Sequence, residues 1–411
     1  MNRRIVEVLM AFLCAGQTLL PAQEFKILDR TVQIHGFASQ GFIYSGGNNW
    51  LTMNTTAGSG AFTEFGLNAS SQMTDRLRIG AQGYDRNLGK LGQYHPSLDW
   101  ALADYRFKSW FGIRGGKVKT TLGLFNDTQD LDFLHTFALL PQSVYPTDLR
   151  DATIAHEGGD IYGEISLKDK LGDLAYTVYS GHRSDSIYSG YPYYLSSFGS
   201  QIKSFGGLQY GADLRWSTPL KNLLIGVSRL DEDIKGSGLA LNPFNLGAGL
   251  VPYAEASKAD WANQFFGKYT VGGLSVASEY RRYWRNQELF SGTSESFADV
   301  RGWYVSGAYR ICKRFQIGSY YSHYTISNVV AGALAPFYPP ATDTSLPANH
   351  DYDKAITGRV DLKRFWNVKI EGHFMDGYGS GPYPNGFYTQ VNPQGFKPDT
   401  NALVIKTSFH F

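Results

Sequence analysis

The sequence is poor in charge, nearly free of cysteine and without any long apolar run. Only 18% of its 411 residues are charged, whereas soluble domains usually carry about 25%. The absence of about 18 consecutive apolar residues excludes a helical membrane protein. Of its two cysteines, Cys14 lies in a segment that we expect to be removed, so Cys312 has no internal disulfide partner. The formal net charge of +2 and the lack of a recognisable motif indicate no nucleic-acid partner.

The sequence also lacks the patterns of catalytic and metal sites. Its nine histidines are scattered, with no HExxH motif and no nucleophile elbow, and residues 156–160 imitate a metal motif without its second histidine. The acidic run at 126–132 lacks the spacing, the glycine and the distal glutamate of a calcium loop. We therefore expect no enzyme, no cofactor and no metal.

What the sequence has in excess is aromatic residues, at 15%, and glycine, at 46 residues. They occur in about 16 segments in which apolar and polar side chains alternate, as in strands that are apolar on one face only. The expected strands are 31–44, 62–73, 77–86, 98–107, 111–120, 158–167, 173–182, 207–216, 223–230, 260–269, 274–284, 298–310, 314–326, 352–362, 367–375 and 401–411.

The connections between these segments alternate between short turns and longer loops rich in glycine, proline, asparagine and serine. Aromatic residues gather beside the short turns, among them Phe107, Trp110, Trp216 and Trp366, where a girdle at the membrane interface is expected. A soluble β-sandwich would supply alternating strands but not this asymmetry of connections. We predict an all-β fold, a transmembrane antiparallel β-barrel with short periplasmic turns and long external loops.

Both ends of the chain agree with export. Residues 401–411 alternate and end on Phe411, and they resemble the C-terminal insertion signal of bacterial outer-membrane β-barrels. This resemblance implies location in the bacterial outer membrane, contact with its lipid and lipopolysaccharide, and recognition by the barrel-assembly machinery. Residues 1–22 combine basic residues, an apolar stretch and a cleavage point after Ala22, as a signal peptide does; a buried helix is the alternative. The expected domains are a signal peptide at 1–22 and a barrel at 23–411.

Strand parity assigns the charged side chains to the barrel interior, because charge on the lipid face is costly. Opposite charges recur two residues apart on this face, as in Asp213/Arg215 and Arg359/Asp361. Two interpretations stay open, a charge-balanced polar wall and a ladder of arginines for anions. The predicted pore-lining residues are Arg78, Asp104, Arg106, Arg114, Lys117, Lys119, Asp213, Arg215, Glu279, Arg281, Arg310, Arg359 and Asp361.

The longest connection, 121–157, is predicted to fold into the lumen and narrow it, as long loops without regular structure are usually functional. It carries Asp127, Asp130 and Asp132 together with Arg150. Acidic side chains on this loop, facing basic residues of the wall, would create a transverse field at the constriction.

A resemblance to one family rests on this region. Residues 115–125, with the sequence GGKVKTTLGLF, and residues 133–136 resemble the strand and constriction loop of the phosphate-selective porin O/P family. The family pattern is Gly-basic-Phe-Lys-x-Pro-Phe-Gly, so Val118 and Thr121 depart from it.

The resemblance implies a water-filled porin, assembled as a homotrimer, for passive diffusion of small hydrophilic solutes or ions. It also implies a preference for anions such as phosphate, with Lys117 and Lys119 at the basic positions. Tyrosine-rich loops at 188–194 and 378–384 leave a saccharide-specific channel as the alternative, because tyrosine stacks on sugar rings. An outer-membrane barrel enzyme is a further alternative, which would need a Ser/His/Asp constellation on the rim.

Overall fold

The structure is a computed structural model that describes residues 23–27, 30–167, 171–196, 199–243, 249–379 and 385–411. The expected signal peptide, 1–22, lies outside the described residues. None of the helices in these described ranges has the length and apolar character needed to cross a membrane.

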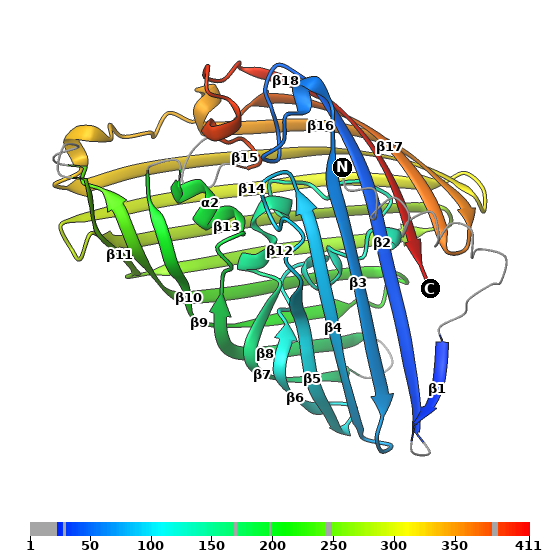
Figure 1. Cartoon of the computed structure of the whole chain (residues 1–411). Coiled ribbons are helices and arrows are strands. Elements are labelled where there is room, and N and C mark those ends of the chain that lie inside the picture. Colours follow the sequence, from blue (N-terminus) through cyan, green and yellow to red (C-terminus); the bar gives the residue numbers. More distant parts are fainter. Residues whose placement is uncertain (1–22, 28–29, 168–170, 197–198, 244–248, 380–384) are drawn as a thin grey trace.

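Strands dominate the chain and form one antiparallel sheet that curves round into a barrel (Figure 1). They are β1 (Gln23–Ile27), β2 (Arg30–Gly46), β3 (Ser59–Gln72), β4 (Leu77–Leu88), β5 (Ser97–Lys108), β6 (Phe111–Lys119), β7 (Ala155–Ser166), β8 (Asp173–Ser184), β9 (Gln201–Ser217), β10 (Leu223–Leu241), β11 (Leu250–Ser257), β12 (Asp260–Val271), β13 (Leu274–Leu289), β14 (Ser294–Arg310), β15 (Phe315–Gly332), β16 (His350–Lys363), β17 (Trp366–Gly377) and β18 (Asp399–His410).

Pairing between β18 and β2 closes the barrel. β18 covers residues 37–46 of β2, and β1 continues along the same edge over residues 30–34, so β1 and β18 share one position. β11 and β12 likewise share the gap between β10 and β13 as one strand interrupted at 258–259. The 18 strands therefore fill 16 barrel positions, and the predicted fold class is confirmed.

Each segment predicted from alternation lies on one of these strands, and β1 and β11 were not predicted. The strands extend further outward than expected; β13 and β14 leave only residues 290–293 between them, where a connection of 285–297 was expected. In this extension both faces carry polar side chains, such as Arg285, Glu288 and Glu295. The apolar alternation that reveals a strand in a sequence is therefore absent there.

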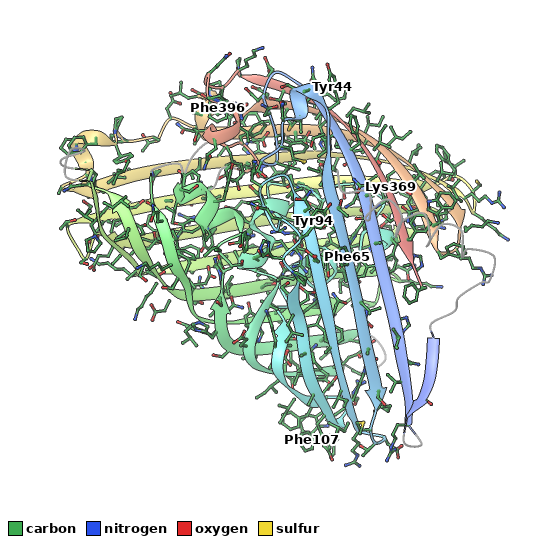
Figure 2. The ribbon with its side chains drawn as sticks, in the orientation of Figure 1. Tyr44, Phe65, Tyr94, Phe107, Lys369 and Phe396 are labelled. Carbon is green, nitrogen blue, oxygen red and sulfur yellow. The ribbon has the colours of Figure 1, made fainter. Side chains whose placement is uncertain are left out.

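An apolar band covers the outer face of the barrel. On β9, Leu208, Tyr210 and Leu214 are exposed, whereas Gln209 and Asp213 between them are buried. Figure 2 shows the same outward side chains on neighbouring strands, from Tyr44 near one rim past Phe65 to Phe107 at the other. Phe107 lies beside the short β5–β6 turn, where Trp110 is also half exposed. The aromatic girdle beside the short turns is thus present.

Candidate functional site: the luminal loop and the barrel wall

The longest connection, residues 120–154 between β6 and β7, lies inside the barrel (Figure 1). It contains three short 3₁₀ turns, η2 (Asn126–Thr128), η3 (Asp132–Leu134) and η4 (Thr147–Ala152). We call it the luminal loop. The expected boundary of 157 is too late, because β7 already begins at Ala155. Side chains of the wall hold this loop at several separate points.

Glu279 on β13 provides the first anchor. This buried carboxylate accepts hydrogen bonds from the Leu124 backbone N–H (3.0 Å), the Tyr145 hydroxyl (2.7 Å), the Tyr304 hydroxyl (2.6 Å) and the Gln264 amide (2.7 Å). A buried carboxylate is tolerated only when its oxygens are satisfied in this way. Two of the donors belong to the loop and two to the wall, so Glu279 joins them.

Gly123, beside this anchor, brings the loop backbone against the wall. Its carbonyl accepts a hydrogen bond from Arg215 on β9 at 2.8 Å. Its φ is +64°, and a Cβ at this position would lie 1.9 Å from the Gln264 side-chain nitrogen. Only glycine combines that backbone conformation with so close an approach. Arg215 in turn pairs with Asp213 at 2.7 Å.

Asp132 is the second anchor and lies between two buried lysines of the neighbouring strands β17 and β18. Lys369 on β17 is 3.0 Å from one carboxylate oxygen and Lys406 on β18 is 3.1 Å from the other. Lys406 also pairs with Glu64 on β3 at 2.8 Å. Lys369 is fully buried and donates to the Asp132 and Phe137 carbonyls. Burial disfavours the charged form of a lysine, and the carboxylate of Asp132 stabilises both ammonium groups.

Two further side chains of the wall bind the backbone of the next segment. Glu371 on β17 accepts the backbone N–H groups of Ala138 (2.9 Å) and Leu139 (3.0 Å). Arg359 on β16 donates to the His135 carbonyl at 2.8 Å, and the same side chain pairs with Asp361. Charged groups of the wall thus replace the water that these backbone groups would otherwise bind.

The last part of the loop is held by a buried charge cluster. Arg150 lies 2.6 Å from Asp99 and 3.3 Å from Asp130, and Lys119 lies 2.8 Å from Asp130. Burial raises the pKa of Asp130, but Lys119 and Arg150 outweigh burial and hold that pKa below its usual range. The Arg150 guanidinium also lies 4.0 Å from the ring centre of Tyr84.

Glycine in the wall permits a further close approach. A Cβ on Gly302 of β14 would lie 2.0 Å from the Ser143 carbonyl oxygen of the loop. Beside it, Arg281 on β13 donates to the Val144 carbonyl at 3.0 Å. The loop is therefore in van der Waals contact with this wall.

The predicted pore-lining residues divide into three groups. Most of them hold the luminal loop or have a partner within the wall. Arg114, for example, pairs with Asp160 at 2.9 Å, and Asp104 accepts a hydrogen bond from the Tyr162 hydroxyl. A second group faces inward, is exposed to water and forms no ion pair within the described ranges; it consists of Arg78, Arg106 and Arg310.

Lys117 stands apart from both groups. The register of β6 places it on the outer face, because Ile113, four residues earlier, is exposed there, and because its partners Ala101 and Glu157 have the same outward parity. Parity counted from Arg114 would have shown this, whereas the family motif suggested a pore position. Lys119, by the same count, starts outward, but its ammonium group reaches inward to Asp130.

The transverse field expected from the acidic residues of the loop is weakened, because two of the three acids are paired with cations of the wall. Asp130 and Asp132 are buried in ion pairs. Asp127 is half-buried, and its contact with Lys119 is made by its backbone carbonyl, not by its carboxylate. The acids therefore neutralise the basic wall. The sequence did not reveal Glu64, Asp99 and Lys406 as partners of the loop. The inward parity of Glu64 and Lys406 was visible, but Asp99 turns inward only because a β-bulge shifts the register of β5 there.

One loop residue predicts a dependence on pH. His135 is buried, which lowers its pKa from 6.5 to about 4, and its Nε2 lies 2.8 Å from the Thr128 carbonyl. His135 takes up a proton at higher pH in the undocked loop than in the docked loop. The free energy that favours docking should therefore decrease by about 3 kcal/mol as pH falls from 6.5 to 4. We expect the current noise of the parent protein in bilayer recordings to increase over this pH interval. The noise of the His135→Gln variant should stay unchanged. Equal noise in both proteins would contradict this role of His135.

Comparison with known proteins finds similarity in structure but not in sequence. No protein-family model matches the sequence, and no curated protein matches it. OmpT of Vibrio cholerae, an outer membrane protein, matches in structure with a TM-score of 0.58 at 10% identity, covering 95% of this chain and 100% of OmpT. A trimer form of OmpT also matches, with a TM-score of 0.52.

Two further solved structures agree. The outer membrane channel DcaP of Acinetobacter baumannii has a TM-score of 0.52 at 10% identity, covering 94% of this chain and 99% of DcaP. OmpF of Salmonella typhi, solved with daunomycin, has a TM-score of 0.53 at 12% identity, covering 95% and 100%. The chain has the fold of bacterial outer-membrane porins. Together with the apolar outer band, this fold places the barrel in the bacterial outer membrane. Identities this low show the fold alone.

Proposed function

We propose that this barrel is a porin, a water-filled and non-catalytic channel for passive diffusion of small hydrophilic solutes. The observation that carries the proposal is the luminal loop, which lies in the interior and is bound by Glu279 on β13 and, through Asp132, by Lys369 on β17, four strand positions further round the wall. A loop held in this way sets the width of a pore. In a barrel built only as a membrane anchor, such a set of buried ionic tethers would have no use.

The charges that stay exposed favour anions. Arg78, Arg106 and Arg310 face the lumen without ion pairs, as described above, while exposed Glu164 on β7 is the opposing carboxylate near the same end. Cations left unpaired in a water-filled path attract anions and raise their local concentration. We propose a preference for small anions, phosphate among them, as in the porin O/P family.

The tyrosine-rich loops support this proposal better than a saccharide channel. Tyr191 is buried in α2 (Gly190–Ser196), and Tyr188 stacks on His95 at 3.7 Å. Both rings are thus engaged in packing. The second tyrosine-rich segment, 378–384, lies mostly outside the described residues.

Liposome swelling tests the proposed function. Purified protein reconstituted into liposomes should admit small neutral and anionic solutes at rates that fall with solute size, since the loop narrows the path. Swelling that requires one particular solute would favour a specific transporter. No swelling from a folded, heat-modifiable barrel would remove the diffusion pore altogether.

We further propose that the outer face of β5 to β8 packs against other copies in a homotrimer. Lys117, Glu157 and His182 are successive cross-strand partners there, and the row continues to exposed Leu208 of the apolar band. An outward charge costs up to about 2–4 kcal/mol in lipid, most at the bilayer midplane and less towards its edges. A protein partner removes that cost, and a trimer form is known for OmpT of Vibrio cholerae.

Reversing one charge of this row tests the interface. Glu157→Lys places two lysines side by side, and we expect the trimer to dissociate into folded monomers by light scattering in mild detergent. Glu164→Lys, which faces the lumen from the same strand, should stay trimeric. A trimer that survives Glu157→Lys unchanged would place the interface elsewhere.

Assembly and surroundings follow the same proposal. Backbone hydrogen bonds join Phe411 to Gly36 at 3.0 and 3.2 Å, so the terminal strand is part of the closing seam. We propose that the barrel-assembly machinery recognises this strand. Lipid and lipopolysaccharide surround the remaining outer face.

A further inference from the structure

A partly open pocket, whose empty space of about 810 Å³ includes the solvent at its mouth, lies between the luminal loop and two external connections. Leu149 of the loop, Tyr191 of α2 and Asn385 of the β17–β18 connection each line it. The remaining lining comes from the inner faces of β8, β9, β10, β13, β14 and β15. A solute bound here would therefore contact the luminal loop.

Arg281 gives this cavity an available cation. One of its terminal nitrogens donates to the Val144 carbonyl at 3.0 Å, and its buried Nε has no hydrogen-bond partner in the structure. It forms no ion pair with any described carboxylate. A guanidinium has five N–H donors in a planar fork, so one carbonyl leaves most of them unused.

The other two arginines of the cavity differ from Arg281. Arg183 pairs with Asp185 (2.7 Å) and Glu232 (2.5 Å). Arg285 lies 3.4 Å from Asp260 and has further contacts. Their charges are compensated within the wall, and that leaves Arg281 as the cation able to receive an anion from solution.

Apolar side chains form one part of the lining, while Gln142, Ser143, Thr153, Glu232 and Asn385 form a polar part. Phe205, Ile234 and Val300 are buried and border the cavity. The hydroxyl of Tyr283 donates to Glu232 at 2.6 Å, and that of Tyr191 lies 3.4 Å from Glu255. Both hydroxyls thus have acceptors, and the Arg285 guanidinium lies 4.7 Å from the ring centre of Tyr191 and Arg281 5.5 Å from that of Tyr283, so these tyrosines pack the arginines of the cavity. The apolar part of the lining suits an apolar or aromatic body better than a sugar.

We propose that this cavity binds small organic anions, with a carboxylate or phosphate on Arg281 and an aromatic or branched aliphatic body against Phe205, Ile234 and Val300. The inference deepens the proposed channel function and rests on it, because the bound anion would contact the luminal loop inside the barrel. It adds a solute class, since inorganic anions would use the charge without the apolar surface.

Calorimetric titration of the full-length barrel in detergent tests the cavity. Benzoate is the probe, and benzyl alcohol is its neutral counterpart. We expect benzoate to bind, benzyl alcohol to bind at least about ten-fold more weakly, and Arg281→Gln to weaken benzoate about ten-fold, the value of one charged hydrogen bond. Glutamine removes the charge and also the hydrogen bond of Nη1 to the Val144 carbonyl, so conductance of this variant is compared with the parent's to show that the loop stays in place. Arg301→Gln, on the outer face of the adjacent strand, should bind benzoate as the parent does.

Three results would overturn the site: no benzoate binding by the folded parent, equal binding of benzyl alcohol, or unchanged binding by Arg281→Gln. Conductance measured on the same preparations separates this proposal from the channel itself. Benzoate binding in a barrel that never conducts would keep the cavity and refute the pore. Conductance without benzoate binding would keep the pore and refute the cavity.

Discussion

Replacing Asp132 with asparagine should release part of the luminal loop and give a larger, less steady conductance. The substitution removes the carboxylate that lies between Lys369 and Lys406. Lys406 keeps Glu64, but Lys369 is left fully buried with only the Asp132 and Phe137 carbonyls as partners. Removing one member of a buried ion pair typically costs about 3–5 kcal/mol. We expect a loss of this size to free the segment around Asp132, while Glu279 still holds the part of the loop at Leu124 and Tyr145.

Asp127→Asn is the matched control, because it makes the same chemical change in the same loop. Asp127 is half-buried, and the lysine beside it binds its backbone carbonyl, which the substitution retains. We expect parental conductance from this variant. Both proteins should show the heat-modifiable mobility of a folded barrel. Parental conductance from Asp132→Asn would mean that the lysine pair does not hold the loop.

Replacing Arg78, Arg106 and Arg310 together with glutamine should abolish or invert the selectivity for anions. These three side chains are the inward, exposed cations without ion pairs in the described part of the chain. Without these three cations, the exposed carboxylate of Glu164 is the charge that remains near this end of the lumen among the four side chains. The reversal potential in a KCl gradient should therefore move from the anion side towards zero or beyond.

Salt and position provide the controls for this second prediction. The shift should shrink at high ionic strength, since exposed charges are screened over about 10 Å at 0.1 M salt. A triple variant at Arg229, Arg282 and Arg301 removes the same charge from the outer face, where these side chains pair with Asp231 and Asp299. It should keep the parental reversal potential. Equal shifts in both triple variants would show that the luminal arginines are not special.

The sequence predicted the wall well because the wall follows a local rule. Alternation with period two places Gln209 and Asp213 inside and Leu208 and Tyr210 outside, and the barrel closes by repeating this rule from strand to strand. The same rule applies to Lys117, which parity from Ile113 places outside. The short family motif had suggested a pore position for Lys117, but the register of β6 decides which way the side chain starts.

The interior of the luminal loop could not be predicted in the same way. Its contacts join residues far apart in the chain, as in the 237 positions between Asp132 and Lys369. Loop conformation depends on positions such as Gly123, whose left-handed backbone and tight packing are visible only after folding. Acidic residues that suggest a field across the pore in the sequence are, in the folded chain, the counter-ions of buried lysines and arginines.

Single-channel conductance in a planar bilayer, with a KCl gradient across it, shows directly whether this barrel is an open, anion-selective pore. We expect stable steps that are small for a barrel of 16 strands, because the loop occupies the lumen, and a reversal potential on the anion side. Silence from a folded barrel would contradict the open pore. A cation-selective reversal potential would contradict the role given to the unpaired luminal arginines.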